Sequence, residues 1–324
     1  MNRKIVAIDC GKAETKVYAY DTANARIRDL VIRSKAEHTK GLVKMSAKDK
    51  AHVVTFRNPL ADMEGEWIVG ANGGATSYSN SKKDHIHKIL TMLAIALMTE
   101  NGDFVIPSIG CPLSVFSNDP EKDAYLDYIF PDGRVDMTVD GRERYFYIEK
   151  SRSLVFPESY GALFLYEDKF TDKTGVIDIG GLNVNASCFQ KGVLNPFESK
   201  TEKLGYYSLI SHLRTRLNAV CDASFDYTDT ELFLRQGYVT NNKETAKVVE
   251  EVLDTHVMRI KDLLKEWDLI STTLIFIGGT SKLLQHQIER HFGKKIILPE
   301  DANLINCRGF LKAMLDGYGY KSEI

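Results

Sequence analysis

The feature of this chain that most constrains its fold is an internal repeat. The segments "IVAIDCGKAETKVYAY" at residues 5–20 and "GVIDIGGLNVNASCF" at residues 175–189 share one pattern. In each, an apolar strand leads into Asp-x-Gly and a second strand follows, so that Asp9 matches Asp178. A single copy of such a turn is typical of an ordinary β-hairpin. Two copies, each opening one half of the chain, predict two similar domains that face each other across a cleft.

Length and composition agree with a two-domain globular protein. The chain has 324 residues, of which 44% are hydrophobic and 27% are charged, so it can bury a sizeable core. Its strand and helix patterns alternate along the sequence, which predicts an α/β fold. The net charge of −2 argues against direct binding to nucleic acid or to an anionic membrane. A basic segment at residues 33–50 is either an anion- or partner-binding loop or a solvated flap.

The cysteines and the apolar segments bear on the compartment. The five cysteines are scattered and form no CxxC pair, which argues against a disulfide framework and against a structural zinc site. The longest apolar segment, residues 89–98, has about half of the ~20 residues that a membrane-spanning helix needs. We therefore expect a cytoplasmic protein with no direct membrane contact.

The residue types around the two turns are suited to phosphate chemistry. Glycine turns allow backbone N–H groups to approach phosphate oxygens, and an aspartate at each turn can hold a hydrated Mg²⁺ that bridges to phosphates. Lys16, seven residues after Asp9, supplies a cation for the same phosphates. The turn "IGGTS" at residues 277–281 precedes a predicted helix, with Thr280 or Ser281 as its cap. Its glycines would let a base or a ribose lie against the backbone.

Glu158, in "PESYGALFLY", has two interpretations. Pro157 suits the first turn of a predicted helix. Glu158 could then simply be a first-turn carboxylate that interacts favourably with the helix dipole, which contributes under ~1 kcal/mol to stability. At a helix that enters the cleft, it could instead orient a water for attack on a terminal phosphate. No strong base is needed for that role, because positioning and charge neutralisation dominate phosphoryl transfer.

Five segments, in this order along the chain, resemble the motifs of the actin, sugar-kinase and heat-shock-chaperone ATPase superfamily. They are phosphate 1 "DCGKAETK", connect 1 "FPESYGAL", phosphate 2 "IDIGGLNVNAS", adenosine "IGGTSKLL" and connect 2 "NCRGFLKAM". The resemblance covers essentially the full length, and within the superfamily the chain is most similar to bacterial actin-like proteins of the plasmid-segregating ParM and Alp group.

The resemblance implies a fold and a function. The fold would have two actin-like, RNase H-like α/β domains with a nucleotide cleft between them, each with a smaller inserted subdomain. Domain I would comprise residues 1–156 and 308–324, with its insertion at about 33–75. Domain II would comprise residues 157–307, with its insertion at about 205–264. The implied function is hydrolysis of ATP or GTP with Mg²⁺ and polymerisation into filaments. Such filaments move plasmid DNA through an adaptor protein bound at a centromere-like site.

The resemblance also assigns roles to individual residues. Glu158, Asp178 and Asp9 would act in hydrolysis, and the two aspartates would hold Mg²⁺ through water. The expected nucleotide contacts are Gly11, Lys12, Thr15, Lys16, Gly180, Gly181, Asn183, Gly278, Gly279, Thr280 and Lys282. Two departures stand out: Lys12 occupies a place where a small hydroxyl residue is common, and Asn183 and Asn185 stand where relatives often carry Thr and Asp. A neutral asparagine holds Mg²⁺ less strongly than a carboxylate does.

A small-molecule kinase of the sugar-kinase type, on the same fold, is the alternative function. Such an enzyme needs a further aspartate as base toward the substrate hydroxyl, whereas Glu158 is better suited to activating water. Cys10 lies beside the first turn, so we also expect bound nucleotide to slow its reaction with a bulky thiol reagent.

Overall fold

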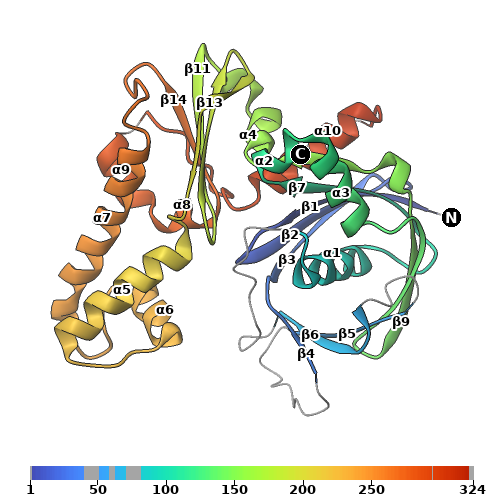
Figure 1. The fold of residues 1–324 in the computed structure, drawn as a ribbon, viewed down its shortest axis with the longest axis horizontal. Helices are drawn as coiled ribbons and strands as arrows, with labels where there is room; N and C mark the ends of the chain where they lie inside the picture. Colours follow the sequence, from blue (N-terminus) through green and yellow to red (C-terminus); the bar gives the residue numbers. More distant parts are fainter. Residues whose placement is uncertain (1, 40–50, 58–62, 71–81, 294, 321–324) are drawn as a thin grey trace. The chain divides into compact units, whose positions relative to one another are not determined.

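A computed structural model describes residues 2–39, 51–57, 63–70, 82–293 and 295–320. The chain forms two compact units (Figure 1). Unit 1 comprises Met1–Leu165 with Leu304–Ile324, and unit 2 comprises Tyr166–Asn303. The domain limits expected from the sequence, at residues 156 and 307, are not tested by this division and stay predictions. The expected basic segment and the insertion at about 33–75 lie partly outside the described residues.

Unit 1 is a mixed sheet with helices on both of its faces. Among the described residues its strands form one ten-stranded sheet in the order β3-β2-β1-β7-β9-β8-β5-β6-β4, with β10 paired to β7. The strands are β1 (Arg3–Cys10), β2 (Glu14–Asp21), β3 (Arg26–Arg33), β4 (Ala36–His38), β5 (His52–Phe56), β6 (Glu66–Val69), β7 (Phe104–Cys111), β8 (Gly133–Val139), β9 (Arg142–Ile148) and β10 (Leu154–Pro157). The helices are α1 (His85–Met98), α2 (Leu113–Phe116), α3 (Asp119–Ile129), α4 (Tyr160–Leu165) and α10 (Ile305–Gly317), with a 3-10 turn η2 (Lys150–Arg152).

Unit 2 has a smaller sheet, in the order β13-β12-β11-β14. Its strands are β11 (Lys173–Ile179), β12 (Val184–Gln190), β13 (Val193–Glu202) and β14 (Thr273–Ile277). Its helices are α5 (Tyr206–Cys221), α6 (Tyr227–Gln236), α7 (Ala246–Leu263), α8 (Gly279–Leu283) and α9 (Gln285–Phe292), with 3-10 turns η3 (Glu167–Lys169) and η4 (Lys243–Thr245). None of the helices described in either unit combines the length and the apolarity that crossing a bilayer requires.

The two sheets repeat one topology around the two Asp-x-Gly turns. β1 pairs antiparallel with β2 and parallel with β7, and β11 pairs antiparallel with β12 and parallel with β14. A parallel neighbour requires a crossover connection, which contains α1 in unit 1 and α5, α6 and α7 in unit 2. The α/β fold with two related halves, predicted from the sequence repeat, is therefore confirmed.

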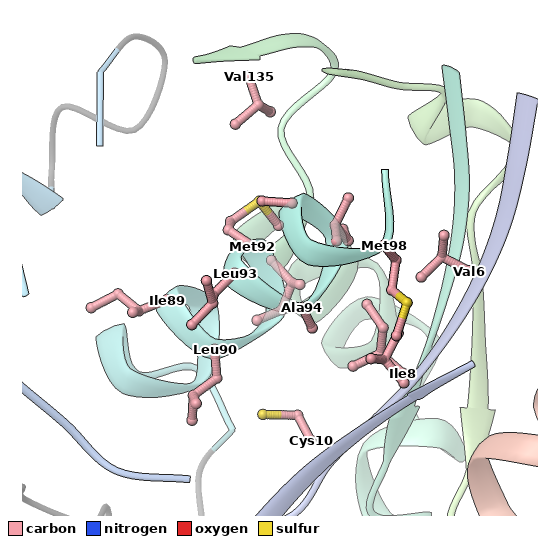
Figure 2. Close-up of a cluster of buried hydrophobic side chains, with 14 of the residues drawn as sticks. Val6, Ile8, Cys10, Ile89, Leu90, Met92, Leu93, Ala94, Met98 and Val135 are labelled. Carbon is pink, nitrogen blue, oxygen red and sulfur yellow. The ribbon is translucent and has the colours of Figure 1, made fainter. Parts of the chain in front are cut away.

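Strand β1 is buried on both faces, and successive residues of a strand point to opposite faces. Val6, Ile8 and Cys10 pack in the cluster that contains α1, whereas Ile5 and Ala7 pack in the cluster that contains α10. Figure 2 shows Ile8 and Cys10 on the side of the sheet where the α1 side chains gather. The apolar run "IVAI" in β1 thus reflects a strand covered by a helix on each side.

The end of β10 differs from the expectation drawn from the sequence. Pro157 was expected in the first turn of a helix, but it is the last residue of β10 and pairs with Cys111 of β7. Helix α4 begins only at Tyr160. The prediction was wrong because proline is also tolerated at the margin of a sheet, where no ladder hydrogen bond from its nitrogen is required.

Helix α4 and helix α10 meet at two glycines. A Cβ atom at Gly309 would lie 2.2 Å from the carbonyl oxygen of Gly161, and a Cβ atom at Gly161 would lie 2.3 Å from Asn306 Cα. The two backbones can approach this closely only because neither residue has a side chain. This contact holds the segment that follows β10 against α10.

We expect Gly309→Ala to lower the free energy of unfolding by about 1–3 kcal/mol or more, because the added methyl group must displace the α4 backbone. Gly317→Ala, in the same helix, is the matched control, since a Cβ atom there meets nothing within 4 Å. In the control we expect no loss, or a gain of up to ~1 kcal/mol from helix propensity. Urea unfolding of both variants measures the difference, and equal effects would contradict the proposed backbone contact.

Candidate functional site

The first Asp-x-Gly turn joins β1 to β2. The Gly11 N–H donates to the carbonyl oxygens of Asp9 and Glu14, each at 3.1 Å. A Cβ atom at Gly11 would lie 2.9 Å from the Glu14 oxygen, so the turn closes tightly. Thr15 is fully buried, and its hydroxyl lies 2.9 Å from the Ser34 hydroxyl. The buried Thr15 side chain therefore stabilises the turn through this hydrogen bond to Ser34.

Two ion pairs lie around this turn. Asp9 and Lys16 are cross-strand partners, and Lys16 Nζ lies 3.8 Å from Asp9 Oδ2. Both side chains are about nine-tenths buried, at 10% exposure for Asp9 and 11% for Lys16. Lys12 Nζ lies 3.1 Å from Asp84 Oδ2, and Asp84 also caps the N-terminus of α1. The structure thus brings Asp9 and Lys16 together, and their roles toward a nucleotide stay predictions.

Cys10 lies in the core rather than beside the open side of the turn. It is 1% exposed, and burial raises the pKa of its thiol to about 11. Because side chains alternate along the strand, Cys10 lies on the face opposite Asp9. Its sulfur points toward Leu90 of α1 (Figure 2). The expected protection of Cys10 by nucleotide assumed an accessible thiol, and that assumption was wrong.

Glu158 follows β10 directly, and its N–H donates to the Cys111 carbonyl oxygen at 2.9 Å. β10, β7 and β1 are adjacent parallel strands, so Glu158 and Asp9 lie at the same, carboxyl-terminal edge of the sheet. Ligands of open α/β sheets commonly bind at this edge. Ser159, the next residue, has φ of +77° and donates its N–H to Asn306 Oδ1 at 3.0 Å. This left-handed residue turns the chain from β10 into α4.

Lys82 is a residue of this site that the sequence analysis did not identify. Its buried ammonium donates to Glu158 Oε1 in an ion pair. Burial alone would lower the pKa of Lys82, but the negative charges of Glu158 and Asp9 outweigh it and raise the pKa, so the amine is protonated. In the sequence, "KKD" before a helix has the form of a solvated helix start, so no pattern distinguished Lys82 from its neighbour Lys83.

The second Asp-x-Gly turn joins β11 to β12 and is closed by the start of α5. The Gly180 N–H donates to the Asn183 carbonyl oxygen at 3.0 Å. The N–H groups of Tyr206 and Tyr207 donate to the carbonyl oxygens of Gly180 and Gly181, at 3.0 and 2.9 Å. A Cβ atom at Gly205 would lie 2.6 Å from the Gly181 oxygen. Gly205, which the sequence analysis did not single out, therefore permits the helix to approach the turn.

The "IGGTS" turn lies directly against the second Asp-x-Gly turn. Gly278 has φ of +90°, and a Cβ atom there would lie 2.6 Å from Asp178 Oδ1. The Thr280 hydroxyl donates to the Gly180 carbonyl oxygen at 3.1 Å. Asp178 itself is 7% exposed. Unit 2 thus brings together residues that the sequence separates by about one hundred positions.

The expected helix cap after this turn was wrong. Helix α8 begins at Gly279 with Gly278 as its N-cap, and no side chain caps it. Thr280 and Ser281 lie inside the helix, and the Ser281 hydroxyl donates to the Ile277 carbonyl oxygen at 2.5 Å. Lys282, an expected nucleotide contact, is exposed on α8.

The asparagines of the second turn distinguish the two hairpins. Asn185 faces Asp178 across the strands, at the position where Lys16 faces Asp9. Asn185 Oδ1 accepts a hydrogen bond from the Thr201 hydroxyl at 2.9 Å. The repeat therefore reproduces the aspartate but replaces the cation with an amide.

We expect Gly278→Ala to destabilise the chain by about 1–3 kcal/mol, because the residue has a left-handed φ and its new methyl group would overlap Asp178 and the Ile179 carbonyl. Gly279→Ala is the control, since a Cβ atom there meets only Asn303 Cβ at 3.7 Å. Thermal unfolding of the two variants tests this contact. A melting temperature that is equally lowered in both variants would argue against it.

Comparison with known proteins adds to this geometry. Residues 7–161 match the family model described as actin like proteins N terminal domain. No curated protein sequence matches the chain. An Alp12 filament structure is 25% identical, covers 98% of this chain and 100% of its own, and has a TM-score of 0.71.

Two further structures share the fold at lower identity. A 15-stranded ParM filament from Clostridium botulinum is 17% identical over 98% of this chain and 100% of its own, with a TM-score of 0.76. Ta0583, an archaeal actin homolog in complex with ADP, is 18% identical over 95% of this chain and 98% of its own, with a TM-score of 0.73. The family match includes the first turn and Glu158, and the structural matches cover nearly the whole chain.

Proposed function

We propose that this chain, an actin-like protein of the ParM and Alp group, is an NTPase that binds ATP or GTP with Mg²⁺ and polymerises into filaments. The observation that carries the proposal is the pair of glycine turns, each placed beside a buried aspartate at the carboxyl end of a central strand. Among the similar proteins, Ta0583 binds ADP, and both Alp12 and the ParM of Clostridium botulinum form filaments. These relatives support both halves of the proposal.

The residues of unit 1 are suited to the phosphates of a nucleotide. Lys16 carries a cation beside the first glycine turn, and Gly11 keeps that turn free of a side chain. Asp9 carries a carboxylate, the ligand type that Mg²⁺ prefers. Mg²⁺, when bound, would neutralise phosphate charge during transfer.

Asp178 offers the same ligand type in unit 2, where Gly278 lies against it. Across the described residues, no three His, Cys, Asp or Glu side chains gather into a ready metal centre. A magnesium ion here would therefore take most of its ligands from water and phosphate, as is usual for this ion.

We assign to Glu158 the orientation of the attacking water. Its carboxylate lies at the same sheet edge as Asp9 and is held by Lys82. Phosphoryl transfer depends chiefly on such positioning and on charge neutralisation. A sugar-type kinase would need a base that acts on a substrate hydroxyl. Glu158 is better suited to activating water, so it favours hydrolysis over this alternative.

We further propose that the filament segregates plasmid or other DNA in the cytoplasm through a DNA-binding adaptor. The net charge of −2 supports an adaptor rather than direct contact with DNA. All five cysteines are free, which suits a reducing compartment.

Sedimentation at micromolar protein tests the proposed function. We expect the protein to pellet with ATP or GTP and Mg²⁺, to remain in the supernatant with EDTA, and to show filaments by negative-stain microscopy. A protein that stays monomeric with nucleotide while it phosphorylates a sugar would establish the kinase instead.

Glu158→Gln tests the assignment of the water-orienting residue. We expect phosphate release to slow by about 100-fold, because the variant keeps the shape of the side chain but loses its charge, while nucleotide-dependent pelleting persists. Glu121→Gln, at an exposed glutamate in the same unit, is the control and should hydrolyse at the wild-type rate. Unchanged phosphate release in Glu158→Gln would remove this residue from the mechanism.

A further inference from the structure

Lys82 is placed in a way that is unusual for a lysine. Its side chain is 7% exposed, and the Glu158 side chain with which it pairs is 16% exposed. Lysine is almost never buried unless it is paired. A buried ion pair is weak evidence for stability, since desolvation offsets much of the attraction between the charges. The position of the pair therefore calls for an explanation beyond stability.

The surroundings of Lys82 belong to the proposed nucleotide site. The charge of Asp9 acts on its ammonium together with that of Glu158. These two carboxylates lie at the ends of β1 and β10, on either side of β7. Lys82 thus places a positive charge beside Glu158 and within the electrostatic influence of Asp9.

Lys16 and Lys82, both in unit 1, have different carboxylate partners. Lys16 lies 3.8 Å from Asp9, within the hairpin. Lys82 reaches Glu158 from the segment that leads into α1, and so joins the start of α1 to the end of β10. The lysine ammonium can donate up to three hydrogen bonds, and a carboxylate can accept about four, so this pairing is compatible with a water on Glu158.

We propose that Lys82 is the positioning residue for Glu158: its ammonium fixes the orientation of the carboxylate that directs the attacking water. The inference rests on the proposed NTPase function and adds a residue to that site. Lys82 acts through Glu158, not on the phosphates. A purely structural ion pair would instead link α1 to β10 with no effect on the chemical step.

The test compares hydrolysis by five variants with that of the wild type: Lys82→Met, Lys82→Arg, Glu158→Gln, the double variant Lys82→Met/Glu158→Gln, and Lys83→Met. Lys83 is the adjacent, exposed lysine and serves as the matched control. Single-turnover phosphate release gives the rate of the chemical step, and fluorescent-nucleotide titration gives the affinity.

We expect Lys82→Met to slow the chemical step by about 10- to 100-fold, as misplacement of a catalytic group does, with nucleotide affinity within about threefold of the wild type. Lys82→Arg should recover part of the rate. The double variant should be no slower than Glu158→Gln alone, because residues that act as a unit are not additive. Lys83→Met should match the wild type.

Two results would overturn the role of Lys82 while leaving the proposed function intact. One is an unchanged rate in Lys82→Met, and the other is a double variant whose loss is the product of the two single losses. If Lys82→Met alone does not fold, the double variant, which leaves no unpaired buried charge, takes its place: a rate below that of Glu158→Gln would mean that Lys82 acts independently of Glu158 and would overturn the role. A wild-type protein that binds nucleotide without hydrolysing it would overturn the proposed NTPase activity and the role of Lys82 together.

Discussion

The burial of β1 on both faces is the constraint on which the rest of unit 1 depends. One face of the strand packs with α1, and the other packs with α10. Because side chains alternate along the strand, its last residues diverge: Cys10 enters the core on the α1 side, while Asp9 is held on the opposite face. The strand thus delivers a carboxylate to the sheet edge by the same pattern that fills the core. A shift of one residue in register would exchange Asp9 and Cys10.

The second constraint is close approach between backbones, which glycine alone permits. Gly309 lets α4 lie on α10, Gly205 lets α5 close the second turn, and Gly278 lets the "IGGTS" turn lie against Asp178. At each place a Cβ atom would come within 2.6 Å of another atom. Each of these glycines lies where two segments that are separated in the sequence come into contact. The candidate site and the packing of the helices therefore both require residues without a side chain.

Charge differs between the two halves even though the topology repeats. The first hairpin sets Lys16 against Asp9, and Lys82 adds a second buried cation that pairs with Glu158. The second hairpin sets Asn185 against Asp178. Both of these lysines, Lys16 and Lys82, belong to unit 1. The two halves share a fold but differ in the electrostatic environment that each offers to phosphate.

Local pattern was enough to predict much of this protein. The alternation around Asp9 and Asp178 predicted both hairpins, and the duplicated motif predicted two related α/β halves, because strand periodicity and glycine turns are properties of adjacent residues. The ends of elements were less certain: Pro157 closes a strand rather than opening a helix, and Thr280 lies inside a helix rather than capping it. Both outcomes depend on a neighbouring segment.

The pairing of Lys82 with Glu158, the burial of Cys10 and the contact of Gly278 with Asp178 appeared only in the folded chain. Each of these features depends on packing between residues that are far apart in the sequence. The two contacts join distant segments, and the burial of Cys10 depends on which face of β1 is covered by α1. The sequence pattern around a residue carries no record of which distant atom will lie beside it, and for that physical reason these features required the three-dimensional structure.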